Sequence, residues 1–133
     1  MIFIDTSAII AILGNEPDAS QFAAKIQAER ERICGPHVIL EASMRLSTLS
    51  GLAPTAADAE VTRALRAANV AIVPITEQVA HVAVAAFERY GKGRKSRAGL
   101  NFGDCLSYAC AKVHGARLLF KGGDFGHTDI AEA

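Results

Sequence analysis

Short apolar runs alternate along the chain with longer segments of helical period. The runs at residues 2–4, 33–34, 70–73 and 117–120 predict strands, and each lies next to a segment in which apolar residues recur every three or four positions. Those segments predict helices at residues 7–13, 17–28, 36–50, 55–68 and 77–90, and a last helix in the stretch 100–115, capped by Asn101. Because strands separated by helices favour a parallel sheet, we expect an α/β fold with a central, mainly parallel sheet of four to five strands, covered by helices on both faces.

Particular residues mark the ends and the buried faces of these helices. Pro17 and Pro36 suit the first turn of a helix, and Gly51 with Pro54 predicts the end of the third one. The residues at core spacing in helix 36–50 are Val38, Ile39, Ala42, Leu46 and Leu49. Those in helix 77–90 are Val79, Val82, Ala83, Ala86 and Tyr90.

The composition limits the classes of protein. At 133 residues, half of them apolar, the chain has the size of one domain, and we expect a single domain over residues 1–133. Fourteen basic against fourteen acidic residues give a net charge of zero, so any attraction for a polyanion must be local. Three cysteines without a C-x-x-C pair argue against a disulfide framework and against a thiolate zinc site. No apolar run reaches the roughly 18 residues of a membrane span, and we expect a cytoplasmic protein.

Four carboxylates follow the predicted strands or open a helix beside them. Asp5 follows the first strand, Glu41 lies in the second helical turn after the second strand, Asp104 stands in the first turn of the last helix, and Asp124 follows the last strand. Since the carboxyl ends of parallel strands meet at one edge of a sheet, we expect these side chains to meet there. Neighbouring carboxylates resist joint ionisation, which predicts a cation between them. With oxygen ligands only, that cation is expected to be Mg²⁺, with Mn²⁺ as the alternative.

The residues around the first strand and the last helix also have structural interpretations. Asp5, Thr6 and Ser7 suit the N-cap of a helix, although the two hydroxyls are also placed to hold a metal-bound water or a substrate phosphate. Asp104, three residues after Asn101, would complement the helix dipole. For each residue considered alone, this structural role is an alternative to metal binding.

The other two carboxylates have similar alternatives. Glu41 would pair with Arg45 one turn later in the same helix, and Asp124 would be an ordinary turn residue. We favour the metal site because independent caps and turns have no reason to fall on one edge of a sheet. The four histidines share no ligand spacing, and only His127 is expected near the rim of the site.

The segment before the last helix is strongly basic. Five of the fourteen basic residues fall within residues 89–97, and no acidic residue lies between Glu88 and Asp104. Glycines open this segment into a loop and Tyr90 offers an aromatic face for base stacking, so we expect it to bind a nucleic acid; the alternative is a solvated loop kept basic for solubility. The candidate nucleic-acid-binding residues are Arg89, Lys92, Arg94, Lys95, Arg97 and, after the last strand, Lys121.

Four stretches together resemble the PIN-domain ribonucleases, and specifically the VapC toxins of bacterial type II toxin–antitoxin systems. They are MIFIDTSAIIAILGNEP, VILEAS, RYGKGRKSRAGLNFGDCLSYACAK and LLFKGGDFGHTDI, which occur in the family's order from one end of the chain to the other. The resemblance covers nearly the whole chain. The resemblance implies a three-layer PIN-like fold, a Mg²⁺- or Mn²⁺-dependent endoribonuclease, a homodimer, and inhibition by a VapB antitoxin whose C-terminal segment blocks the active site. It places the family's acidic residues on Asp5, Glu41, Asp104 and Asp124, with Asp129 as a fifth. Gly123 departs from the polar or acidic residue that relatives often carry.

The chemistry expected of such a site is hydrolysis of a phosphodiester by a metal-activated water. Asp5 and Asp104 would ligate the ion, and Glu41 and Asp124 would hold its waters or a second ion. A haloacid-dehalogenase-type phosphatase would need a second Asp where Ser7 stands, and a response-regulator receiver would need a phosphoacceptor Asp that the stretch 71–76 lacks. A catalytically idle module that binds RNA or an antitoxin is the alternative from a different class.

Overall fold

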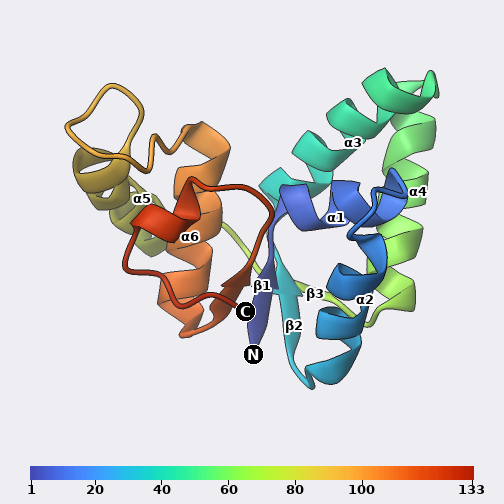
Figure 1. Cartoon of the computed structure of the whole chain (residues 1–133), viewed down its shortest axis with the longest axis horizontal. Helices are drawn as coiled ribbons and strands as arrows, with labels where there is room; N and C mark the ends of the chain where they lie inside the picture. Colours follow the sequence, from blue (N-terminus) through green and yellow to red (C-terminus); the bar gives the residue numbers. More distant parts are fainter.

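The computed structural model describes all residues from Met1 to Ala133 and contains the elements that the apolar pattern predicts. In chain order these are β1 (Ile2–Ile4), α1 (Thr6–Leu13), α2 (Ala19–Ala28), β2 (Arg32–Cys34), α3 (Pro36–Ser50), α4 (Pro54–Ala67), β3 (Ala71–Ile72), α5 (Glu77–Tyr90), α6 (Phe102–His114) and β4 (Arg117–Leu119). A short 3₁₀ helix, η1 (Phe125–His127), follows β4 and was not predicted. Figure 1 shows them along the chain. The predicted alternation of strands and helices is confirmed.

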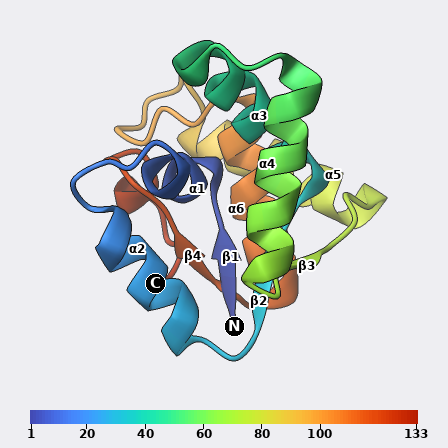
Figure 2. The same cartoon turned by 90° about the vertical axis from the view of Figure 1, so that its right-hand side faces the viewer.

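The four strands form one sheet in the order β3-β2-β1-β4, and every neighbouring pair is parallel. Helices α1 to α4 lie on one side of the sheet and α5 and α6 on the other, as Figures 1 and 2 show. This is the three-layer α/β arrangement expected from the sequence. The edge strand β3 is shorter than predicted, and both of its residues are exposed.

The path of the chain through the sheet creates a reversal beside β1. The chain steps from β1 to β2 to β3 in one direction, and α5 and α6 then carry it back across the sheet to β4, on the other side of β1. The backbone N–H of Asp5 donates to the carbonyl of Leu119 over 3.0 Å, which joins the ends of β1 and β4. In open α/β sheets, the crevice outside the carboxyl ends of the strands at such a reversal is where ligands bind.

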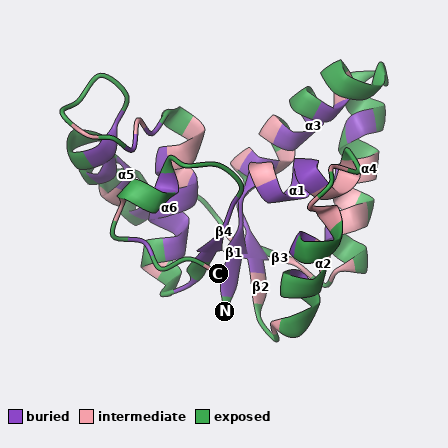
Figure 3. Cartoon of the chain, in the orientation of Figure 1, coloured by how far each residue is buried: buried purple, intermediate pink, exposed green.

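The core is a single cluster of 34 buried apolar residues. Figure 3 shows that β1 and most of β2 and β4 are buried, and that exposed positions lie mainly on the outer faces of the helices and in the loops; the edge strand β3 is exposed. The three cysteines, Cys34, Cys105 and Cys110, are buried and unpaired, so they serve as small core residues. None of the helices combines the length with the apolar character that a membrane span requires.

Three local predictions were wrong. Pro17 precedes α2, because a turn closed by the hydrogen bond from Ala19 N to Glu16 O (2.9 Å) delays the helix to Ala19. Leu49 is 65% exposed, because it lies in the last turn of α3, beyond the buried face that ends at Leu46. Tyr90 offers no stacking face, because it is only 8% exposed and packs against Tyr108, as its helical spacing predicts.

Candidate active site

A polar cleft of about 310 Å³ is bordered by the segments that follow β1 and β4 and by helices α3 and α6. Eleven residues line it, and only Phe125 among them is apolar. The four predicted carboxylates are all in this lining, so the structure brings them together at one edge of the sheet. The lining residues are Asp5, Ser7, Glu41, Arg45, Asn101, Asp104, Lys121, Gly122, Gly123, Asp124 and Phe125.

Asp5 is the most buried of the four carboxylates, with 5% of its surface exposed. It occupies the N-cap of α1, where its Oδ2 accepts hydrogen bonds from the backbone N–H of Ser7 (3.0 Å) and from the Ser7 hydroxyl (2.6 Å). The Ser7 hydroxyl in turn accepts from the backbone N–H of Lys121 over 2.9 Å. Ser7 therefore fixes the Asp5 carboxylate and ties the start of α1 to the segment after β4, while Oδ1 of Asp5 accepts no hydrogen bond from the protein.

Asp104 forms a capping box with Asn101 at the start of α6. The Asn101 side chain accepts from the backbone N–H of Asp104 (2.8 Å), and Oδ2 of Asp104 accepts from the backbone N–H of Asn101 (3.1 Å). The pKa of the Asp104 carboxyl is nevertheless raised to about 6, chiefly by burial and also by the negative charges of Asp5, Glu41 and Asp124, which together outweigh the lowering effect of the hydrogen bond from Asn101. Asp104 therefore belongs both to the cap of α6 and to the carboxylate cluster.

Glu41 reaches the cleft from α3 and lies against the first turn of α6. A methyl group on Gly103 would lie 2.7 Å from Oε2 of Glu41, so only glycine leaves room for the carboxylate in this position. The pair between Glu41 and Arg45 that the helical spacing suggested does not form. Asp124 is exposed and caps no helix through its side chain, although it precedes η1.

The carboxylates fit a hard cation that keeps much of its water. No group of three or more His, Cys, Asp or Glu side chains in this structure is arranged to hold a metal ion, so the carboxylates alone do not form a complete coordination shell. Mg²⁺ is usually bound by one or two carboxylates, with waters and substrate oxygens completing its shell. Burial is the main cause of the raised pKa of Asp104, and the charges of Asp5, Glu41 and Asp124 add to it; a divalent cation between the carboxylates would relieve that repulsion.

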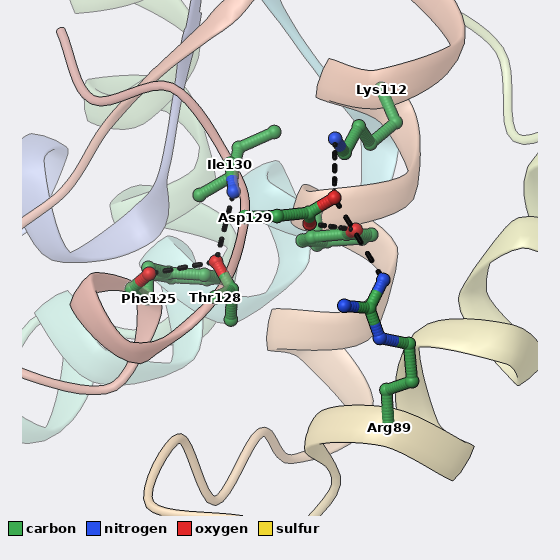
Figure 4. A network of polar contacts seen from close by, with 7 residues as sticks. Arg89, Lys112, Phe125, Thr128, Asp129 and Ile130 are labelled. Carbon is green, nitrogen blue, oxygen red and sulfur yellow. Dashed lines mark hydrogen bonds and ion pairs between the residues drawn. The ribbon is translucent and has the colours of Figure 1, made fainter.

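Three other predicted residues, Thr6, His127 and Asp129, lie outside the cleft lining. Thr6 is buried, and its hydroxyl has no hydrogen-bond partner. His127 is exposed on η1. Asp129 accepts from the Tyr108 hydroxyl (2.5 Å) and from Lys112 Nζ (3.1 Å), and lies 3.9 Å from Arg89 (Figure 4).

Asp129 has a different environment from the cleft carboxylates. The hydrogen bond from Tyr108 lowers the pKa of Asp129, and the hydrogen bond and charge of Lys112 act in the same direction. The network joins the C-terminal segment to α6 and to the end of α5, where the basic loop begins. The structure therefore places Asp129 in a network of polar contacts with α5 and α6, and not among the carboxylates of the cleft.

The basic loop is exposed and has few partners. Arg89 and Arg94 lie over the rings of Tyr90 and Phe87, at 4.7 Å and 5.0 Å from the ring centres. The other three basic residues, Lys92, Lys95 and Arg97, are exposed and have no acidic partner within the chain. None of the five lines the cleft.

Lys121 behaves differently from the loop residues. It lines the cleft, but its ammonium group pairs with Asp18 (3.0 Å) and Glu16 (3.3 Å). The hydrogen bond to Asp18 raises the pKa of Lys121. The structure thus gives Lys121 acidic partners that the sequence did not indicate.

Sequence reasoning missed three features of this region. Gly103 creates the space for Glu41, and Phe102, at the start of α6, is 84% exposed. Arg45 lines the cleft, whereas the sequence suggested it only as a partner for Glu41. Its position one turn after Glu41 on the same helix face could have indicated that both side chains reach the cleft.

Comparisons with known proteins show the family to which the chain belongs. The PIN domain family matches residues 2–131. Ribonuclease VapC30 of Mycobacterium tuberculosis is 44% identical over 128 residues, which span 96% of this chain and 95% of the relative. Ribonuclease VapC of Mycolicibacterium smegmatis is 43% identical over 128 residues, spanning 96% of each protein.

Solved structures agree on the fold. VapC20 of Mycobacterium tuberculosis, described as a sarcin-ricin loop cleaving toxin, has a TM-score of 0.76 at 19% identity and covers 100% of this chain and 98% of its own. A chain of a toxin–antitoxin complex from Klebsiella pneumoniae has a TM-score of 0.72 at 18% identity and covers 97% of this chain and 93% of its own. With a family match over nearly its whole length and VapC relatives above 40% identity, this chain belongs to the PIN-domain family, among the VapC proteins.

Proposed function

We propose that this protein is a metal-dependent endoribonuclease, the toxin of a bacterial type II toxin–antitoxin system. The observation that carries the proposal is the meeting of Asp5, Glu41, Asp104 and Asp124 in one polar cleft, with the pKa of Asp104 raised to about 6. An uncompensated carboxylate cluster at the reversal of an α/β sheet fits a divalent cation better than it fits any role in stability. The names of the curated relatives, ribonuclease VapC, support RNA as the substrate.

The burial and the hydrogen-bond partners of the cleft residues indicate which of them would bind the ion directly and which would bind its waters. Asp5 and Asp104 hold the ion, because each has one oxygen fixed by a helix cap and a second oxygen that no group in the protein occupies. Glu41 and Asp124 hold waters around it. When bound, Mg²⁺ or Mn²⁺ would lower the pKa of a coordinated water and offset charge on the phosphoryl group. Ser7 supports this arrangement by fixing Asp5 in one orientation.

The basic loop would attract a polyanion locally, although the whole chain has a net charge of zero and exerts no overall attraction. Lys92, Lys95 and Arg97 are exposed without acidic partners, so their charges are available to backbone phosphates. Phe102, exposed at the end of the loop, supplies the stacking face that was expected of Tyr90. Together they would hold single-stranded RNA beside the cleft.

The proposal includes partners and a compartment. We infer a VapB-type antitoxin that covers the cleft, since a chain similar to this one is part of a toxin–antitoxin complex in Klebsiella pneumoniae. We also infer a homodimer, to which exposed apolar side chains on α3 and α5 such as Leu40 and Val84 would contribute, and a cytoplasmic location beside the RNA substrate.

The test is RNA cleavage by the purified protein with Mg²⁺ or Mn²⁺, with EDTA, and with the variant Asp5→Asn. We expect cleavage that stops in EDTA and falls by orders of magnitude in Asp5→Asn, leaving 5′ phosphate and 3′ hydroxyl ends. Asp58→Asn is the matched control, because Asp58 is an exposed carboxylate on α4, outside the cleft. Undiminished cleavage in EDTA would refute the metal-dependent mechanism. Binding of RNA without any cleavage would favour the idle binding module.

A further inference from the structure

Arg45 is a cleft residue with no internal partner. It lies on α3, one turn after Glu41, and its side chain is exposed in the lining of the acidic cleft. None of the ion pairs in the chain includes it. The neighbouring carboxylate of Glu41 is directed at Gly103 on α6 instead. The guanidinium of Arg45 therefore remains available to a ligand, although four carboxylates share its cleft.

Lys121, the other basic residue of the cleft, already forms ion pairs within the protein. Lys121 pairs with Glu16 and Asp18, on the side of the cleft that faces α2. Arg45 is thus the one cation in the cleft lining without an acidic partner. A guanidinium presents five N–H donors in a planar fork that matches the oxygens of a phosphate, which makes arginine well suited to bind a nucleic-acid backbone.

The position of Arg45 complements that of the basic loop. Helices α3 and α6 diverge from the ends of the strands, and the loop at residues 91–99 leads into α6 while Arg45 stands on α3 (Figure 1). An RNA strand that crosses the cleft would pass over negative charge in the middle. It would meet positive charge on the α6 side from the loop and on the α3 side from Arg45.

We propose that Arg45 binds a backbone phosphate of the RNA adjacent to the scissile one, on the α3 side of the cleft, and so fixes which phosphodiester reaches the carboxylates. This inference rests on the proposed ribonuclease function. Arg45 acts in this account by binding the substrate in its ground state, so its loss should change affinity far more than the rate constant of the bound complex.

The experiment compares Arg45→Ala and Arg45→Lys with Arg66→Ala. Arg66 is the matched control because it is an exposed arginine without an acidic partner on α4, outside the cleft. Binding of a short single-stranded RNA is measured by fluorescence anisotropy at several salt concentrations, in proteins made inactive by Asp104→Asn. Cleavage kinetics are measured in the active proteins, and melting curves confirm that each variant is folded.

We expect Arg45→Ala to raise Kd and KM by roughly tenfold, since a lost charge-assisted contact of about 1.4 kcal/mol corresponds to that factor. The slope of log K against log salt should fall by about 0.7, the value for one phosphate contact to a single strand. Arg45→Lys should keep the salt slope and recover part of the affinity, because it keeps the charge but loses the fork. Arg66→Ala should match the parent protein in all three quantities.

Two results would overturn this inference and leave the proposed function intact. One is an Arg45→Ala protein that binds RNA with the Kd and salt slope of Arg66→Ala. The other is a large loss of kcat with unchanged Kd, which would assign Arg45 to the reacting phosphate. A parent protein that neither binds nor cleaves RNA would overturn the proposed function, and this inference with it.

Discussion

Replacing Asp104 with Asn separates the two roles that the structure gives this residue. As a cap, Asp104 stabilises the start of α6 through its hydrogen bond to the backbone N–H of Asn101. As a member of the carboxylate cluster, it destabilises the metal-free protein, because burial and three neighbouring negative charges oppose its ionisation. The substitution keeps an oxygen for the cap and removes the charge. The sign of its effect without metal therefore shows which role dominates.

The magnitude follows from the pKa. The Asp104 carboxyl rises from its ordinary value of 3.8 to about 6 in the folded protein. A folded-state pKa above the unfolded one means that stability falls as the pH rises through this interval, and the full cost is present above it. A shift of about two units corresponds to about 3 kcal/mol, but the side chain is partly exposed, and solvent screening reduces a realistic cost to roughly 1 kcal/mol. Against this, Asn loses the charge at the helix N-terminus, worth roughly 0.3–1 kcal/mol.

We therefore expect Asp104→Asn to melt at or slightly above the wild-type temperature in EDTA near pH 7, by up to about 3 °C for a domain of this size. In Mg²⁺ at ten times its Kd, the wild type should gain about 1.4 kcal/mol, or about 4–5 °C, because the ion binds only the native state. The mutant should hardly respond. Differential scanning fluorimetry at both conditions measures the four temperatures.

The same assay can refute the reasoning. If Asp104→Asn is clearly less stable than the wild type in EDTA, and both proteins respond equally to Mg²⁺, then Asp104 is a structural cap and the cation binds elsewhere or not at all. Asp58→Asn should follow the wild type in both conditions, which controls for the general effect of removing a surface carboxylate.

Three further predictions test neighbouring parts of the site. The Mg²⁺-induced rise in Tm should be smaller at about pH 5 than at about pH 7.5, because Asp104, with a pKa of about 6, must lose its proton to bind the ion; equal rises would contradict this. Gly103→Ala should leave the Tm in EDTA unchanged or higher, since Ala favours a helix over Gly by up to about 1 kcal/mol, but it should slow RNA cleavage because the added methyl group displaces Glu41. Full activity of this variant would show that this position of Glu41 is dispensable. Neutralising three loop residues together should weaken RNA binding and lower the salt slope by about 2, with the Mg²⁺-induced rise in Tm unchanged, whereas an unchanged slope would make the loop a solvated surface. These three residues are Arg94, Lys95 and Arg97.

The parts of the site that the sequence predicted are those determined by the backbone. Apolar runs located the strands, and a residue that directly follows a parallel strand must lie at the carboxyl edge of the sheet. Asp5 reaches the cleft for this reason, Asp124 reaches it from the segment that continues after β4, and the helix signal at Asn101 placed Asp104 beside them. None of these inferences needed the conformation of a side chain.

The parts that the sequence could not predict depend on contacts between distant elements. A pair such as Glu41 and Arg45 on one helix is worth only about 0.2–0.5 kcal/mol, so the packing of α3 against α6 overrides it and directs Glu41 toward Gly103. Asp129 is positioned by the C-terminal segment, which pairs with β4 through Leu118 N and Ala131 O at 2.8 Å. That pairing brings Asp129 to Tyr108 on α6, and nothing in the spacing of the motif specifies it.

Tyr90 shows how two sequence signals compete. Its helical spacing predicted a core position, and its place at the edge of a basic loop suggested a stacking face. Burial of a large aromatic side chain is worth more than an exposed contact with a ligand that is not always present. The core position therefore prevails, and the exposed aromatic ring beside the loop is that of Phe102.

The caps and the carboxylate cluster support one another. Asp5 caps α1 and Asp104 caps α6, so both helices direct their N-terminal ends toward the cleft. The partial positive charge of a helix N-terminus stabilises a carboxylate by roughly 0.3–1 kcal/mol, which offsets part of the repulsion among the four acids. The two hydrogen-bonded caps also hold the carboxylates in fixed orientations before any ligand arrives. In the proposed site, Asp5 and Asp104 would therefore serve both as caps and as ligands, because capping occupies one carboxylate oxygen and would leave the other for the ion.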